Sequence, residues 1–212
     1  MLMHFHIYTI QAKSNNSKGF SLIEAAVVVL IMLIVTVLAI PSLAALSRTY
    51  KSTGDGRDVY GAISLAKMRA AADFTHVRVY ADLTANTMHL EVWDSTASQW
   101  KPETGAQSRG IQSLGSGDTF GYGSLTTAPP NTQGTLGQAA ACRNDANTAD
   151  IANTACVVFN SRGIPIDSTN GPTGQGALYM TDGKEVYGTT VSATGLLRFW
   201  RSGLANPSWV QH

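Results

Sequence analysis

The sequence predicts an α+β fold in which a long N-terminal helix packs against an antiparallel β-sheet head. Three observations support this fold class. Residues 25–40 form an apolar run, residues 57–74 place apolar side chains at three- or four-residue spacing, and from residue 76 the spacing becomes two. A helix followed by strands is the α+β order. The 212 residues suffice for this helix and one modest domain.

The N-terminal segment has a basic leader and an apolar run. The first 19 residues end in a polar stretch with Lys13 and Lys18 and no acidic residue, which the positive-inside rule keeps in the cytoplasm. Residues 25–40 are apolar apart from Thr36, and three apolar residues shortly before them bring the run close to the ~20 residues of a membrane span. We therefore expect a single-pass anchor or a signal sequence here.

The helix is expected to continue beyond the apolar run. Pro41 follows directly, and helix-favouring residues come after it, so we predict a kink at Pro41 rather than a stop. Gly54 and Gly56 then predict that the helix loosens or breaks. Helical periodicity resumes at residue 57. Four apolar positions are predicted to face the core and three basic ones to remain in solvent: Val59, Ile63, Ala66 and Ala70, and Arg57, Lys67 and Arg69.

The remaining chain predicts the antiparallel head. Residues 76–82 and 87–93 alternate with period two and form a hairpin around residues 83–86. Residues 104–155 contain eight glycines and five charges, which indicates loops with at most short strands. Further strands are predicted at 156–160, 177–181, 185–193 and 196–200, with a tight turn at Asp182-Gly183. The core-facing positions of the hairpin are Val77, Val79, Ala81, Met88, Leu90 and Val92.

The charge balance argues against one class of function. The chain has a formal net charge of +1, and beyond residue 19 it carries 13 basic and 14 acidic residues. A globally basic nucleic-acid binder is therefore not indicated. We expect three parts: a leader at 1–19, a transmembrane and spine helix at 20–50, and a globular α+β head at 51–212.

The two cysteines, Cys142 and Cys156, would close a ring of 15 residues. In an exported chain this pair predicts a disulfide, worth about 3 kcal/mol in the loop-entropy model. The alternative is two buried free thiols in a reducing compartment. The apolar N-terminal run argues for export and favours the disulfide.

Glu24 at the start of the apolar run needs an explanation, because a charge at the bilayer centre costs about 2.5 to 3.5 kcal/mol. An ordinary secretory signal cut near Ala44 gains nothing from this carboxylate. A capping box, in which Ser21 and Glu24 satisfy free amides at the helix start, is compatible with other roles. A plain membrane anchor leaves the adjacent Gly19-Phe20 pair unexplained.

The stretch KGFSLIEAAVVVLIMLIVTVLAIPSL resembles the class III signal of the type IV prepilin and pseudopilin superfamily. The shared features are a basic leader, a glycine and then a phenylalanine at the cut, a glutamate as fifth mature residue, and an apolar helix with a proline. The resemblance implies that a prepilin peptidase cleaves between Gly19 and Phe20 and methylates the new amine of Phe20. It also implies that Glu24 neutralises the Phe20 amine of a neighbouring subunit during assembly.

Three later stretches, GRDVYGAISLAKMRAAADFTHVRVYAD, CVVFNSRGIPID and VSATGLLRFWR, resemble the minor pilin and pseudopilin family that includes GspH, FimT and FimU. In FimT-type members linked to DNA uptake, the terminal strand carries a glycine, arginine, any residue, arginine pattern. Here leucine replaces the first arginine, and Arg198 and Arg201 remain after Gly195. Contact of these two arginines with DNA phosphates is one expectation, and ordinary solvent-facing strand residues are the other.

The resemblance implies a pilin-like, non-enzymatic subunit of a type IV pilus or a type II secretion filament. Its expected partners are other pilin or pseudopilin subunits, the prepilin peptidase and the inner-membrane assembly platform. It would cross the inner membrane once, with its N-terminus in the cytoplasm and its head in the periplasm, and then enter a pilus or pseudopilus. The alternatives are a DNA-receptor minor pilin for natural transformation and a membrane-anchored enzyme or ligand-binding domain that never polymerises.

No catalytic or metal site is expected from the sequence. The common nucleophile, metalloprotease, P-loop and dinucleotide motifs do not occur, so we predict neither catalytic residues nor a cofactor. The histidines lack metal-ligand spacing: His4, His6, His76, His89 and His212. The acidic run from Asp145 to Asp150 lacks calcium-loop spacing and is interpreted as a solvated loop.

Overall fold

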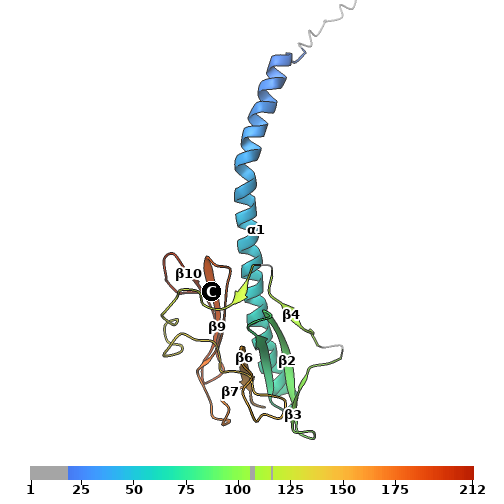
Figure 1. Cartoon of the computed structure of the whole chain (residues 1–212), viewed down its shortest axis with the longest axis vertical. Coiled ribbons are helices and arrows are strands. Elements are labelled where there is room, and N and C mark those ends of the chain that lie inside the picture. The colour runs from blue at the N-terminus through green and yellow to red at the C-terminus, as the bar shows by residue number, and fades with distance from the viewer. Residues whose placement is uncertain (1–18, 106–107, 116) are drawn as a thin grey trace, which may run out of the picture. The chain divides into compact units, whose positions relative to one another are not determined.

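The computed structural model describes residues 19–105, 108–115 and 117–212. The chain divides into two compact units, of which the first ends at Leu46 and the second runs from Ser47 to His212. One helix, α1 (Leu22–Ala72), begins in the first unit and ends in the second, where the strands lie (Figure 1). The expected leader, with Lys13 and Lys18, lies outside the described residues apart from Gly19.

Helix α1 is not interrupted at Gly54 or Gly56, so the prediction of a loosened or broken helix is wrong. Gly56 is buried, and a Cβ there would lie 3.0 Å from Cβ of Tyr187 and 3.1 Å from Cζ of Phe199. Glycine therefore allows the helix backbone to approach the strands that carry these aromatic rings. Packing against the strands outweighs the ~1 kcal/mol that a glycine costs inside a helix.

Six strands form the first sheet, and all pairs are antiparallel. Its order is β3-β2-β1-β6-β7, with β4 also beside β2. The β1–β2 hairpin pairs Asp82 with Thr87, which confirms the predicted turn at residues 83–86. The strands are β1 (Val77–Asp82), β2 (Thr87–Asp94), β3 (Gln99–Pro102), β4 (Gln112–Ser113), β6 (Thr154–Phe159) and β7 (Pro165–Ile166).

The second sheet is also antiparallel, in the order β11-β10-β9-β8-β5. The Asp182-Gly183 turn joins β8 to β9 as predicted, and Asp182 Oδ1 accepts hydrogen bonds of 2.8 Å from the amides of residues 184 and 185. Gly183 has a φ of 81°, a left-handed value that suits glycine. The strands are β5 (Thr119–Phe120), β8 (Gly176–Thr181), β9 (Glu185–Val191), β10 (Leu197–Gly203) and β11 (Val210–Gln211).

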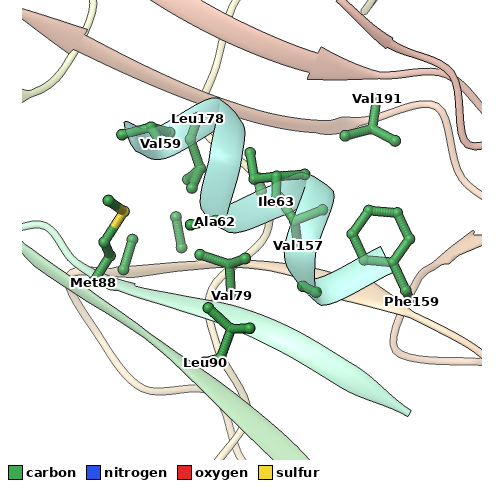
Figure 2. Close-up of a cluster of buried hydrophobic side chains, with 14 of the residues drawn as sticks. Val59, Ala62, Ile63, Val79, Met88, Leu90, Val157, Phe159, Leu178 and Val191 are labelled. Carbon is green, nitrogen blue, oxygen red and sulfur yellow. The ribbon is translucent and has the colours of Figure 1, made fainter. Parts of the chain in front are cut away.

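The hydrophobic core of the second unit lies between α1 and the two sheets (Figure 2). Ala62 and Ile63 of the helix belong to this core. They pack together with Val79 and Leu90 from the first sheet and with Leu178 from the second. The predicted core positions of the helix and hairpin are at most 4% exposed, except for Val92, which is partly buried. The α+β prediction, with a helix packed on antiparallel sheet, is confirmed.

Two basic residues of α1 are not free in solvent as predicted. Lys67 is half-buried, and its Nζ donates a 2.8 Å hydrogen bond to the Gly195 carbonyl. Arg69 pairs with Glu103, with 2.8 Å between Nη2 and Oε1. Both side chains therefore tie the helix to loops of the second unit, and of the three predicted solvent positions only Arg57 is exposed.

Candidate functional site

The predicted processing site lies directly before α1. Gly19, Phe20 and Ser21 are not helical, and the first helical residue is Leu22. The Ser21 carbonyl accepts a 3.1 Å hydrogen bond from the amide of Ala25, so Ser21 occupies the N-cap position. Gly19 is exposed, and among the described residues other than its chain neighbour no atom lies within 4 Å of the place where its Cβ would be.

Glu24 lies in the first turn of α1 and is exposed. A carboxylate at this position interacts favourably with the N-terminal end of the helix dipole. The described residues offer Glu24 no ion pair, and neither side-chain hydrogen bond of the Ser21–Glu24 capping box is formed among them. Within the described ranges, the Glu24 carboxylate thus has no side-chain partner.

The first unit exposes apolar side chains on every side of α1. A helix that is apolar all round normally has its surface covered by other protein or by lipid. Thr36, a polar residue in this run, donates from Oγ1 to the Met32 carbonyl at 2.7 Å. The following large apolar residues are each at least 39% exposed: Phe20, Leu22, Ile23, Val27, Val28, Val29, Leu30, Ile31, Met32, Leu33, Ile34, Val35, Val37, Ile40, Leu43 and Leu46.

Judged by length and mean hydropathy, the helical part of the described chain includes no segment suited to crossing a membrane.

Residue 41 lies within the continuous helix α1. The kink that we expect at Pro41 stays a prediction.

The two cysteines form the predicted disulfide. Cys142 and Cys156 are bonded, with Cα atoms 4.8 Å apart, and both are buried. Cys156 belongs to β6, and its amide donates to the Ala140 carbonyl at 2.8 Å, while the Cys142 amide donates to Thr154 Oγ1 at 2.9 Å. The bond and these two hydrogen bonds fix the loop of residues 142–154 against the first sheet.

The two arginines considered for DNA contact do not form one patch. Arg198 and Arg201 are three residues apart on β10, so they point to opposite faces of the sheet. Arg201 makes a bidentate pair with Glu185, at 2.8 Å and 2.5 Å, and this hydrogen bonding raises the pKa of Arg201. Arg198 makes a long 3.5 Å contact with the Asn131 carbonyl. A phosphate bridging both arginines is incompatible with this geometry.

Sequence reasoning missed a buried ion pair on the outer face of the first sheet. Arg78 and Glu91 are directly opposite each other on β1 and β2 and are only 1% and 5% exposed. Arg78 Nε donates to Glu91 Oε2 at 2.5 Å, and Nη1 donates to the Arg143 carbonyl at 2.7 Å. The guanidinium also lies 4.4 Å from the centre of the Trp100 ring. Alternation placed Arg78 correctly on the face opposite Val77 and Val79, but gave no sign that a loop covers it.

Burial and ion pairing shift the pKa values of Arg78 and Glu91 in opposite directions. Burial lowers the pKa of Arg78, against the charge and hydrogen bonding of Glu91. Burial tends to raise the pKa of Glu91, but hydrogen bonds from His89 and Arg78 outweigh it and leave the pKa below its usual value. The carboxylate is therefore ionised at neutral pH and neutralises the buried guanidinium.

A second group of polar residues ties α1 to the loop before β5. Ser52 Oγ donates to Asp118 Oδ1 at 2.9 Å, and the Gly115 amide donates to Asp55. Burial raises the pKa of Asp118 to about 6; the Ser52 hydrogen bond opposes this change, and the neighbouring Asp55 carboxylate adds to it. Within the described ranges, no group of three histidine, cysteine, aspartate or glutamate side chains could hold a metal ion.

Comparison with known proteins gives a match for the N-terminal segment. Residues 14–40 match the model of the prokaryotic N-terminal methylation motif. No curated protein matches the chain. One solved structure of the minor pseudopilin EpsH, from the type II secretion system of Vibrio cholerae, is 13% identical and covers 70% of this chain and 95% of that chain, with a TM-score of 0.45. Another structure of the same protein is 10% identical and covers 70% and 92%, with a TM-score of 0.44. The N-terminal segment of this chain thus matches the prokaryotic N-terminal methylation motif.

Proposed function

We propose that this chain is a non-enzymatic structural subunit, a minor pilin or pseudopilin, of a type IV pilus or type II secretion filament. One observation carries the proposal: the methylation motif at residues 14–40 leads into a helix whose large apolar side chains are exposed on all sides. Packing of such helices against those of neighbouring subunits would cover this surface. The partners are accordingly other pilin or pseudopilin subunits.

Assembly depends on Glu24 in this proposal. Cleavage between Gly19 and Phe20 by a prepilin peptidase creates a positively charged amine at Phe20. Glu24 is then the fifth residue of the mature chain. A buried amine or a buried carboxylate is costly alone, whereas a pair from two subunits is tolerated. The exposed Glu24 carboxylate, which has no ion-pair partner among the described residues, supports this role.

Before assembly, the subunit lies in the inner membrane, with its N-terminus in the cytoplasm and its head in the periplasm. The assembly platform then extracts it from this membrane. The methylation motif supports membrane anchoring. The Cys142–Cys156 disulfide supports an oxidising compartment for the head. The proposal of a single membrane crossing rests on the motif and the positive-inside rule, and not on the hydropathy of the described helix.

Mass spectrometry of the mature N-terminus tests the first step. The expected product begins with N-methylated Phe20, and Gly19→Ala should leave the leader attached, because the peptidase needs a residue without a side chain at the cut. Normal processing of Gly19→Ala in a gel-shift assay would contradict the proposal. A protein that begins near Ala45 would indicate an ordinary secretory signal instead.

A pair of variants separates assembly from anchoring and from helix capping. Glu24→Ala should be cleaved normally, and its free energy of membrane insertion should be more favourable than that of the wild type by up to about 3 kcal/mol. It should nevertheless fail to enter filaments. Ser21→Ala removes the other half of the capping box and keeps the carboxylate, so it should enter filaments normally. The measurement is co-purification of the mature protein with sheared filaments or partner pilins. Wild-type recovery of Glu24→Ala with filaments would refute the pairing role and leave Ser21 and Glu24 as no more than a helix cap.

A further inference from the structure

A cavity of about 240 Å³ lies on the outer face of the first sheet, away from the core. Its floor consists of outward-facing residues of adjacent strands, among them Arg78, Trp93, Trp100 and Val158. Its walls come from the disulfide loop and from residues 167–170, which follow β7. Drug-sized ligands occupy sites of about 300–1,000 Å³, so this cavity suits a molecule with a single ring.

The cavity is held in shape by contacts from several elements. The Arg78 guanidinium donates to the Arg143 carbonyl at 2.7 Å, and the Trp100 amide donates to the Asp145 carbonyl at 2.8 Å. Both contacts attach the disulfide loop to the sheet. Trp93 and Trp100 lie opposite each other on β2 and β3, with ring centres 5.4 Å apart and planes inclined at 68°. The site is therefore preformed, with an aromatic floor.

Each of the two arginines that line the cavity is paired with a carboxylate. The Arg78 charge is neutralised by Glu91, and Arg143 has Asp150 at 3.7 Å. Burial lowers the pKa of His76, which favours its neutral form. Asp167 already accepts hydrogen bonds at Oδ1 from Thr169 and Gly171, which stabilise its carboxylate within the chain. An uncharged ligand fits this lining better than an anion or a cation.

The cavity combines an accessible indole with amide side chains at its rim. Trp93 is half-buried and keeps part of its indole accessible, whereas Trp100 beside it is only 4% exposed. Asn147 and Asn170, both exposed, place side-chain amides at the rim. A ring with one apolar face and several hydroxyl groups combines the properties that this arrangement requires: apolar contact with an indole and hydrogen bonding to the rim amides. We propose that the cavity binds a neutral saccharide unit through Trp93, Trp100 and Asn147.

Nuclear magnetic resonance of the four tryptophan indole N–H groups tests this site on the full chain in detergent micelles. A polyoxyethylene detergent is required, because an alkyl maltoside would itself present a sugar. Titration with D-glucose, D-galactose and N-acetyl-D-glucosamine should shift the Trp93 and Trp100 signals in the millimolar range with at least one of these sugars. Trp200 and Trp209, which do not line the cavity, should not move. Acetate and phosphate serve as anionic probes.

Two matched variants locate the ligand. Asn147→Gly removes the rim amide, and glycine tolerates the φ of 56° at this position. The change should weaken sugar binding about three- to tenfold, which is the effect of losing one hydrogen bond. Asn153→Gly makes the same change at the same φ of 56° outside the cavity and should bind as the wild type does. The proposal is overturned if no sugar shifts the two signals, if all four move together, if only the anions act, or if both variants bind equally.

Discussion

Replacing Glu91 by methionine should lower the free energy of unfolding by about 3 to 5 kcal/mol, because it leaves the Arg78 charge buried without its counter-ion. Arg78 cannot escape this cost by losing its proton. Its remaining contacts include the Arg143 carbonyl, at 2.7 Å from Nη1, the Trp100 ring, at 4.4 Å, and the Tyr80 ring, at 5.7 Å. These contacts persist in the variant and should keep the loss toward the lower end of the range.

The companion variants determine whether the charge pair is the cause. Arg78→Met with Glu91→Met replaces both ions by apolar side chains of similar length, and it should recover most of the stability lost in the single Glu91→Met variant. The measurement is urea unfolding of the full chain in non-ionic detergent, followed by circular dichroism. A loss below about 1 kcal/mol for Glu91→Met, or simple additivity of the two changes, would refute the assignment of a desolvated ion pair.

The sign of the pH dependence follows from Glu91. Its pKa is lowered in the folded chain, so its stabilising contribution is present above its unfolded pKa of about 4.5 and is lost as pH falls through the folded value. The wild type should therefore lose more stability on acidification than the double methionine variant does.

Three further predictions concern stability. Cys142→Ser should lower the free energy of unfolding by about 3 kcal/mol under oxidising conditions, and reductant should abolish the difference from the wild type. Gly56→Ala should destabilise the chain by about 1 to 2 kcal/mol, because the new Cβ meets Tyr187 and Phe199. Gly54→Ala, whose Cβ would have no described atom within 4 Å beyond its own turn of helix, should stabilise the chain by up to about 1 kcal/mol. Equal effects of the two changes in thermal unfolding would contradict the packing argument. Asp118 has a raised pKa of about 6 in the folded chain, so its contribution to the free energy of unfolding is full below about pH 3.8 and is lost as the pH rises through 6. The wild type should therefore be less stable at pH 8 than at pH 5, and Asp118→Asn should remove this difference in unfolding experiments at the two pH values.

Periodicity was a reliable guide to the core of this chain. The side chains of Val77, Val79 and Ala81 are fully buried, as their alternation predicted, because a strand with one face on the core must alternate. The disulfide was predicted from two cysteines and an argument for export. Short strands such as β3 and β7 escaped prediction because two to four residues carry too little pattern to be distinguished from loops.

The errors arose where tertiary contacts override local preference. Gly54 and Gly56 favour a helix end by themselves, yet the helix continues, and Gly56 is buried beneath the aromatic residues of β9 and β10. Lys67 was expected in solvent, but the loop carbonyl that it binds belongs to Gly195, which is 128 positions away in the chain. The cavity over Trp93 and Trp100 likewise joins β2, β3, β6 and two distant loops, a combination that no local window contains.

The outermost strands of both sheets are short, and this length has a consequence for how copies of the chain associate. β3 has four residues, and β5, β7 and β11 have two each, whereas the inner strands have six to eight. The outer edge of β3 is partly occupied, since the Trp100 amide donates to the disulfide loop, and Pro165 begins β7. Edges of this kind offer few free amides to a second sheet and so resist strand-to-strand aggregation. Copies of this chain at high concentration are therefore protected from amyloid-like stacking of their sheets.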